Sequence, residues 1–529
     1  MSADTPQPSR ALRAALLLTL AVAAILFSLH GSRFVATNDE GILLEPAQRL
    51  AEGQRPYVDF FGYMSPGSYW IQAAVFRLFG VSLLSARIPV ILGFALQCGL
   101  VLWFAARLAS FRAALITALL FFGFQIADPT FLTAQHRWDS STLALLGLAC
   151  AAASRRGGRL AMPLAMPVAC GVALGLAAWC TPSMGLVILA ALAWFAWLRD
   201  HRGVAAAVGG VAAVSGLAVA LLAAQGSLAA FAAQMLWLKQ NYSTVNIMPY
   251  GSVIGGYGRL FADVSGAALA FTALFVVFLA LPAILPPLAP LAWWAEHRHR
   301  ALPREEAALL ALFLPATAAL VVTAFPRADL MHLAFVAALP AALCGAALSR
   351  LLPARAIGFT TVLLALGALA FASNHARGYA QSVRLHSPAG GLLADHDKAG
   401  ALRQILARVR PGDSLLVHPY MPVLYFATQA RNVSRFSFLA PGMMTAAEER
   451  ELLASLSAAP PAWVLYQPIT REEFLRVFPN ATNLDNAFPS IDRFLAEHYE
   501  PAERHAISYA GYRLLRRKTP FTNSVLQNP

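Results

Sequence analysis

Two adjacent carboxylates, Asp39 and Glu40, follow the first long apolar run, inside the segment FVATNDEGILLEPAQRLAEGQRPYVDFFGYMSPGSYW (34–70). A carboxylate at a membrane surface can act as general base toward a hydroxyl group while a lipid-borne molecule reaches it from the side. The pair also precedes a helical pattern, where an acid can simply cap the helix N-terminus. Both interpretations are open, and the position beside a membrane favours catalysis.

A second acid, Asp139, follows the polar stretch DPTFLTAQHRWDSS (128–141) and begins an apolar run. It could do no more than favour the positive end of a helix dipole. It could also face a polar cavity and position the base or an acceptor, and we expect its neighbours His136 and Arg137 to contact substrate.

Arg327, Asp329 and His332 form a tight cluster late in the sequence. Arg327 and Asp329 could merely pair with each other at a rim, a contact of little energetic value. Arginine is also the side chain best shaped to hold a phosphate in two-point contact. We therefore expect Arg327 and His332 to hold a phosphate. Lys239 is another candidate for phosphate contact, against the alternative that it extends along a membrane interface.

The chain that must position these residues is mostly apolar. Of its 529 residues, 58% are hydrophobic and 13% are charged, with recurrent apolar runs long enough to cross a bilayer. It is therefore an integral membrane protein. The net charge of +13 would suggest nucleic acid in a soluble chain. Here the basic residues fall in short loops, where they set topology, so we expect membrane lipids and no nucleic acid as partners.

About eleven spans are expected from runs of this length. With the N-terminus in the cytoplasm, the basic loops at 107–112, 155–159, 199–202, 298–304 and 350–355 all lie inside, as the positive-inside rule requires. The C-terminus is then outside. The expected spans are 12–30, 84–106, 112–127, 139–153, 161–180, 183–198, 204–224, 264–295, 305–324, 330–349 and 354–373.

The outside segments differ in character from the inside loops. The first, 31–83, contains two patterns of helical spacing, at 41–53 and 67–80, which predict helices along the membrane surface. From residue 374 the composition becomes that of a soluble domain, with buried strands at PGDSLLVHP (411–419) and PAWVLYQP (461–468). We expect a transmembrane domain over 1–373 and a small α/β domain over 374–529.

The acid pair in NDEG (38–41), the segment RPYVDFFGYMSPGSYWIQAAVFRLFG (55–80) and the many-span body resemble the GT-C membrane glycosyltransferases. The similarity is greatest to bacterial members related to protein O-mannosyltransferases and the aminoarabinose transferase of lipid A, of the glycosyltransferase family 39 type. The resemblance implies that Asp39 is the catalytic base, with Glu40 beside it and Asp139 assisting. It also implies that the Arg327/His332 region holds the donor phosphate and that Tyr63, within the motif, contacts substrate.

The expected function is transfer of a hexose or pentose from a polyprenyl-phosphate donor to a hydroxyl of a glycan, lipid or protein. The reaction would occur on the periplasmic face of the bacterial inner membrane, with inversion, during synthesis of an envelope glycan. No cofactor is expected, and a divalent metal remains open. One alternative is an oligosaccharide ligase or polymerase that uses a lipid-diphosphate donor. A lipid or solute transporter is less favoured, because the middles of the spans carry almost no charge.

Overall fold

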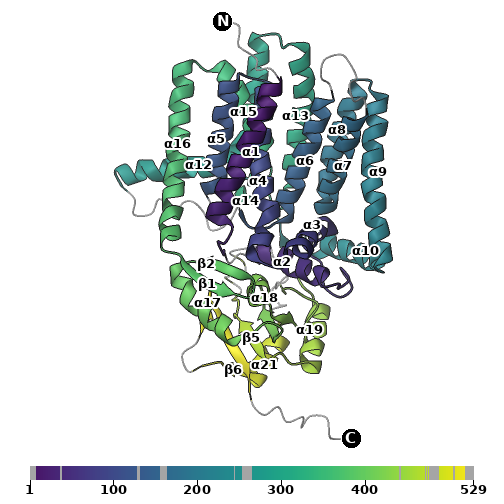
Figure 1. Ribbon diagram of the computed structural model, residues 1–529, viewed down its shortest axis with the longest axis vertical. Helices are drawn as coiled ribbons and strands as arrows, with labels where there is room; N and C mark the ends of the chain where they lie inside the picture. The colour runs from purple at the N-terminus through teal and green to yellow at the C-terminus, as the bar shows by residue number, and fades with distance from the viewer. Residues whose placement is uncertain are drawn as a thin grey trace.

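The computed structural model describes residues 8–518 except 36–37, 128–131, 155–163, 243–244, 253–264, 440–442, 471, 473–474, 476–487 and 504–506. Most helices stand side by side in a bundle, and a smaller part with strands lies beyond one end (Figure 1). The bundle helices are α1 (Pro8–His30), α4 (Leu83–Ala106), α5 (Phe111–Ala127), α6 (His136–Ala153), α7 (Ala165–Cys180), α8 (Gly185–Trp197), α9 (His201–Ala224), α12 (Ala267–His299), α13 (Arg304–Thr323), α14 (Leu330–Ala334), α15 (Ala338–Leu351) and α16 (Ala354–Ala380).

Among the described residues, five helices are long and apolar enough to cross a membrane: α1, α4, α9, α12 and α13. Shorter apolar helices stand beside them, so the chain is a multi-pass membrane protein. A helix covers each expected span, but the one expected at 330–349 is divided into α14 and α15. The total of eleven spans and the cytoplasmic N-terminus remain predictions.

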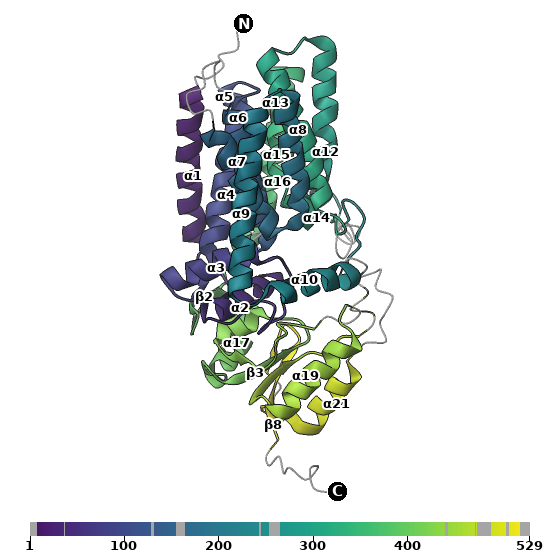
Figure 2. The same ribbon diagram turned by 90° about the vertical axis from the view of Figure 1, so that its right-hand side faces the viewer.

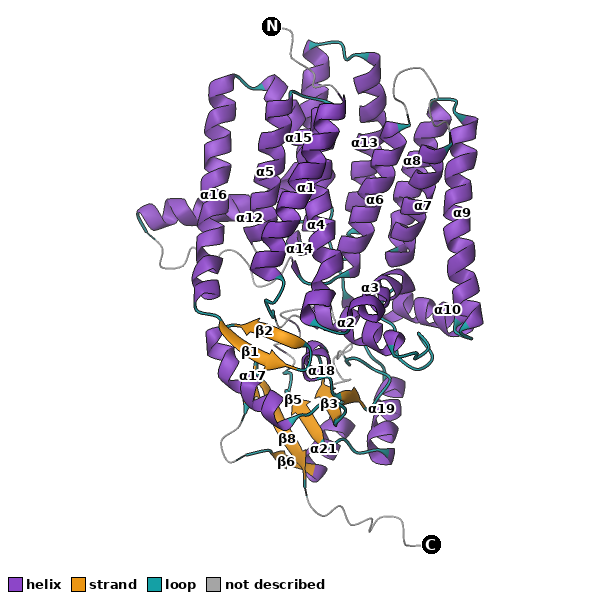
Figure 3. Ribbon diagram, viewed as in Figure 1, coloured by secondary structure: helices purple, strands orange, loops and turns teal. Residues whose placement is uncertain are grey.

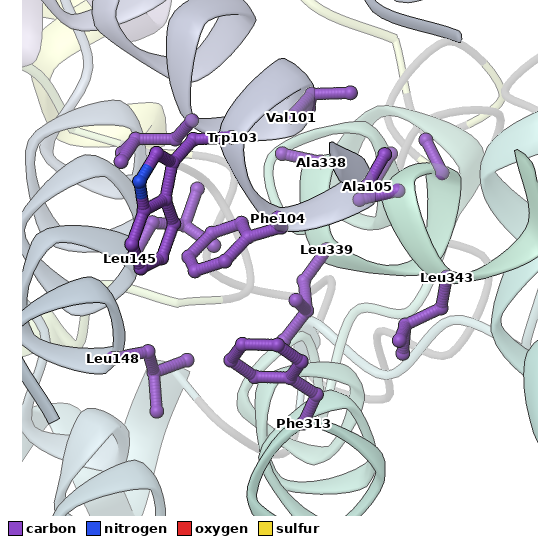
Figure 4. Packing of buried hydrophobic residues seen from close by; sticks show 14 of the residues in the cluster. Val101, Trp103, Phe104, Ala105, Leu145, Leu148, Phe313, Ala338, Leu339 and Leu343 are labelled. Atoms are coloured by element: carbon purple, nitrogen blue, oxygen red, sulfur yellow. The ribbon is translucent and has the colours of Figure 1, made fainter. Parts of the chain in front are cut away.

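The core of the bundle lies around α4. In the most apolar stretch of α4, 72% of the helix is buried inside the protein, whereas the corresponding value for α12 is 11%. Helix α4 is therefore central, and α12 faces outward. Phe104 of α4 meets Phe313 of α13 edge-on, with ring centroids 5.0 Å apart. Leu339 and Leu343 of α15 pack beside the same contact (Figure 4). Such interlocked apolar side chains let α4 hold its neighbours in register.

The two helices expected in the first outside segment are confirmed as α2 (Asn38–Ala51) and α3 (Pro66–Phe79). Together with α10 (Leu228–Trp237) they lie across the end of the bundle that faces the strands (Figures 1 and 2). The side chains of α3 that face inward, such as Tyr69 and Phe76, are buried. A five-residue π-helix, Leu238–Tyr242, continues α10.

The C-terminal part is an α/β structure, with its strands gathered below the bundle (Figure 3). A hairpin of β1 (Val383–Ser387) and β2 (Gly390–Ala394) precedes a mixed sheet in the order β4-β3-β5-β8-β6, with β7 paired to β8. The sheet strands are β3 (Ser414–His418), β4 (Arg431–Asn432), β5 (Trp463–Tyr466), β6 (Tyr499–Pro501), β7 (Ser508–Tyr509) and β8 (Tyr512–Arg517). Its helices are α17 (His396–Arg408), α18 (Val423–Thr428), α19 (Ala446–Ala458) and α21 (Pro489–His498).

The strands expected at 411–419 and 461–468 are confirmed as β3 and β5, which pair in parallel. The expected division between residues 373 and 374 falls inside α16, which continues to Ala380 before the hairpin begins.

Helix α2 joins the bundle to the C-terminal part. A Cβ atom at Gly41 would lie 2.0 Å from the backbone nitrogen of Val423, so glycine is the residue that allows α18 to rest on α2. One turn along, buried Glu45 accepts a hydrogen bond of 2.6 Å from Ser437. The chain before α2 is also joined to β2, since Leu393 donates to the carbonyl of Ser32 over 2.7 Å.

Gly41→Ala should weaken this junction, because the added methyl group collides with backbone that cannot rotate away. Overpacking of this kind costs about 1–3 kcal/mol. The measurement is the melting temperature of the detergent-purified protein, together with the rate of proteolysis between α16 and β1. Gly400→Ala is the control, since Gly400 lies in exposed α17 with open space around it. Equal melting of Gly41→Ala and wild type would contradict the close contact.

Candidate active site

The two acids of NDEG occupy different environments. Asp39 is exposed, whereas Glu40 is fully buried. Successive residues of a helix point about 100° apart, so one acid can face solvent while its neighbour enters the protein. Asp39 is thus the acid of the pair that an incoming molecule can reach.

Glu40 is held by Arg87, which is 1% exposed and projects from the central helix α4. The two side chains form an ion pair, with Arg87 Nη2 also 3.1 Å from Glu40 Oε2. Arg87 donates in addition to the carbonyl of Arg33 over 2.9 Å. The other oxygen of Glu40 accepts from the backbone N–H of Ala134, 3.0 Å away. This geometry supports a positioning role for Glu40, which joins α2 to α4 and to the second outside segment.

Arg327 lies where residues 246–252 and 326–330 pair through their backbones. Met248 N donates to the carbonyl of Pro326 over 3.0 Å, and Gly251 N donates to that of Ala328 over 2.8 Å. The Arg327 side chain is 8% exposed and donates to Asn246 Oδ1 over 2.7 Å. It therefore secures residues 246–252 against the segment that begins α14.

Asp329 connects Arg327 to His332. It accepts from Arg327 Nε over 2.7 Å and caps α14 by accepting from the His332 backbone N–H over 3.0 Å. Burial opposes ionisation of Asp329, but its bonds to His332 and Arg327 outweigh burial and lower its pKa to about 2. Burial lowers the pKa of His332 from its ordinary value, and the hydrogen bond to Asp329 opposes that shift. The cluster thus combines a carboxylate, a guanidinium and an imidazole.

Arg137, at the start of α6, is the most available cation here. It is half-buried, and among the described residues its side chain makes one hydrogen bond, over 2.9 Å to the carbonyl of Thr323. Its charge interacts with those of Asp39, Asp329 and Arg327. His136 interacts with both Arg137 and His332.

Two tyrosines that the sequence analysis did not identify as candidates lie near the same charged residues. Burial raises the pKa of Tyr242, and the charge of Asp39 raises it further against the opposing effect of Arg137. Burial also raises the pKa of Tyr420 well above its ordinary value. Among the neighbouring charges, that of Asp39 contributes most to this increase. Tyr242 ends the π-helix, whereas Tyr420 comes from the loop after β3, far along the sequence. No local pattern marks Tyr420, because its position depends on how the two parts of the chain dock.

The structure therefore brings together Asp39, His136, Arg137, Arg327 and His332 from the predicted set. Asp139 lies elsewhere on α6, where its neighbours are Ser68 and Cys180.

Lys239 and Tyr63 are the two remaining predicted substrate contacts. Lys239 is exposed on the π-helix. Tyr63 donates to the carbonyl of Phe438 and stacks on its ring with centroids 3.8 Å apart, so it supports the interface between the two parts. Catalytic roles for Glu40 and Asp139, and substrate contact by Lys239 and Tyr63, remain predictions.

A hollow in the interior of the bundle differs in character from this charged cluster. A hollow of about 620 Å³ lies between α5, α12, α15 and α16. Apolar side chains form most of its lining, together with Thr117 and Cys344, and the lining includes no charged residue. Within the described ranges, no three His, Cys, Asp or Glu side chains gather in a way that could hold a metal ion. The charged cluster between the bundle and the C-terminal part is therefore the candidate active site.

No family model matches the sequence, and no curated protein matches it either. Solved structures do share its fold. ArnT from Cupriavidus metallidurans bound to undecaprenyl phosphate is 15% identical, with a TM-score of 0.53, over 95% of this chain and 97% of that one. Its apo form has the same identity and coverage, with a TM-score of 0.54.

The oligosaccharyltransferase of Archaeoglobus fulgidus, tethered with an acceptor peptide, is 14% identical with a TM-score of 0.50. It is matched over 94% of this chain and 74% of that one. The chain thus shares the fold of ArnT and of this oligosaccharyltransferase.

Glu40→Gln should destabilise the protein strongly, because it leaves the buried Arg87 charge without its partner. Breaking a buried ion pair costs about 3–5 kcal/mol. The melting temperature in detergent measures the effect. Asp59→Asn is the control, since Asp59 is half-buried and pairs with the exposed Arg55, so it should melt close to wild type. A stable Glu40→Gln protein that has lost activity would instead argue for a direct catalytic role.

Proposed function

We propose that the protein transfers a sugar from a polyprenyl-phosphate donor to an acceptor hydroxyl at the outer face of a bacterial inner membrane. The observation that carries the proposal is an exposed carboxylate, Asp39, whose charge interacts with that of Arg137, beside Arg327, at one end of a bundle with the ArnT fold. ArnT itself was solved with undecaprenyl phosphate, a lipid of the class proposed here. A base opposite phosphate-binding cations is the arrangement that this transfer requires.

Asp39 would act as the general base. It takes the proton of an acceptor hydroxyl, whose oxygen forms a bond to the anomeric carbon of the sugar. The bond from that carbon to the phosphate oxygen breaks, and the electron pair leaves with the polyprenyl phosphate. One carboxylate and a good leaving group suffice for a single displacement, which inverts the anomeric centre.

Arg137 is the cation best placed to receive the departing phosphate. Arg327 is already bound to Asp329 and Asn246, so its main contribution is to fix the segments around the site. Arg137 makes one hydrogen bond among the described residues and retains further N–H donors for phosphate oxygens. Charge that develops on the leaving group would be stabilised by this preorganised donor without reorganisation of solvent.

Asp39→Asn should reduce transfer by about 10²–10⁴-fold, the usual contribution of a general base. The assay uses proteoliposomes with a panel of undecaprenyl-phosphate sugars, and the acceptor is an envelope extract from a strain that lacks the protein. Mass spectrometry identifies the product. Asp59→Asn, which removes a half-buried acid paired with exposed Arg55, should retain activity. Undiminished turnover by Asp39→Asn would overturn its assigned role, and transfer only from lipid diphosphates would favour a ligase.

Arg137→Ala should weaken binding of undecaprenyl phosphate, because the phosphate loses a charge-assisted hydrogen bond. Such bonds contribute about 1.5–3 kcal/mol, which corresponds to roughly 10- to 100-fold in Kd. Native mass spectrometry or a fluorescent lipid analogue can measure the change. Arg77→Ala serves as the control, because Arg77 is an exposed residue of α3 that donates to the carbonyl of Leu50. An unchanged Kd for Arg137→Ala would assign the phosphate to other cations.

A further inference from the structure

We propose that the C-terminal domain contributes Tyr420 to the active site, where its hydroxyl group binds the sugar of the donor. The inference rests on the proposed function and deepens it, because it names a residue that would recognise the glycosyl group itself. It also gives the C-terminal domain a role in substrate selection in addition to covering the site.

The loop that carries Tyr420 lies on the N-terminal end of α2. The carbonyl carbon of Pro422 is 2.5 Å from where a Cβ atom of Gly41 would be, so the two backbones touch. Gly41 comes two residues after Asp39, and Tyr420 comes two residues before Pro422. Residues far apart in sequence therefore meet beside the proposed base.

The Tyr420 side chain is held in place from its own domain. Its backbone N–H donates to the hydroxyl of Tyr512 over 3.1 Å. Its ring packs edge-on against Phe438, with centroids 4.7 Å apart, and Phe438 in turn stacks on Tyr63. A side chain fixed in this way loses little conformational entropy when it binds a ligand.

The Tyr420 hydroxyl remains available. The residue is half-buried, and among the described residues its hydroxyl has no hydrogen-bond partner. Its charged surroundings include both Asp39 and Arg327, so it lies near the base and near the cation cluster. In the proposed reaction the sugar must occupy the space between these groups, since its anomeric carbon links the attacking oxygen to the phosphate.

A phenol suits this position chemically. Its hydroxyl can donate and accept a hydrogen bond, as sugar hydroxyl groups can, and its ring offers an apolar face to sugar C–H groups. Phosphate is bound by cations, which Tyr420 does not supply. We therefore expect it to affect affinity for the sugar and to leave affinity for the lipid phosphate unchanged.

The experiment compares the Kd of undecaprenyl phosphate with that of the undecaprenyl-phosphate sugar that the wild type binds most tightly from a panel of hexoses and pentoses. Tyr420→Phe should weaken binding of the sugar-linked lipid by about 3- to 10-fold, the value of one hydrogen bond. Its Kd for undecaprenyl phosphate should stay within about twofold of wild type, a smaller change than the loss of one hydrogen bond would cause. Tyr466→Phe is the matched control, because that hydroxyl bonds to Asp492 elsewhere in the same domain.

The outcomes separate the two proposals. Equal loss of affinity for both lipids, or no loss for either, would overturn the role of Tyr420 and leave the proposed function standing. A wild type that binds neither lipid would overturn the proposed function and this inference with it. An unchanged melting temperature for Tyr420→Phe shows that a selective loss is not caused by misfolding.

Discussion

The ion pair between Glu40 and Arg87 is the interaction on which the rest of the site depends. Burying two charges is costly, and the cost is offset here by mutual attraction and by the hydrogen bonds to Arg33 and Ala134. Because α4 is the central helix of the bundle, the pair connects α2 to the most buried of the five membrane-length helices. The position of Asp39, one residue away, follows from this attachment.

Two short segments complete the site, and each depends on the other for its conformation. Residues 246–252 and 326–330 have little regular structure, and each satisfies backbone groups of the other. Asp329 then neutralises Arg327 and binds His332, so the cluster remains compact despite its charges. Arg137 alone among these cations keeps much of its hydrogen-bonding capacity among the described residues. Charges that hold the structure together and a charge that remains available are thus separated within one small region.

Much of the fold was predictable because membrane helices and surface helices have strong local signals. The apolar runs, the pattern at 41–53 and 67–80, and the strands β3 and β5 all depend on periodicity that one sequence contains. The expected topology also placed Asp39, Arg137 and Arg327 on one side of the membrane, so their clustering could be anticipated. The separation of Asp39 from Glu40, and of Asp139 from the cluster, depends on helix rotation and tertiary packing. Tyr420 depends on docking between domains, which no local pattern encodes.

The backbone pairing between residues 246–252 and 326–330 also restricts how such a chain can vary. A shift of one residue in extended pairing turns every side chain to the opposite face. An insertion or deletion inside either segment would therefore move Arg327 away from Asn246 and disconnect Asp329 from its arginine. We therefore expect an insertion or deletion in one of these two short segments to be tolerated only with a compensating change in the other.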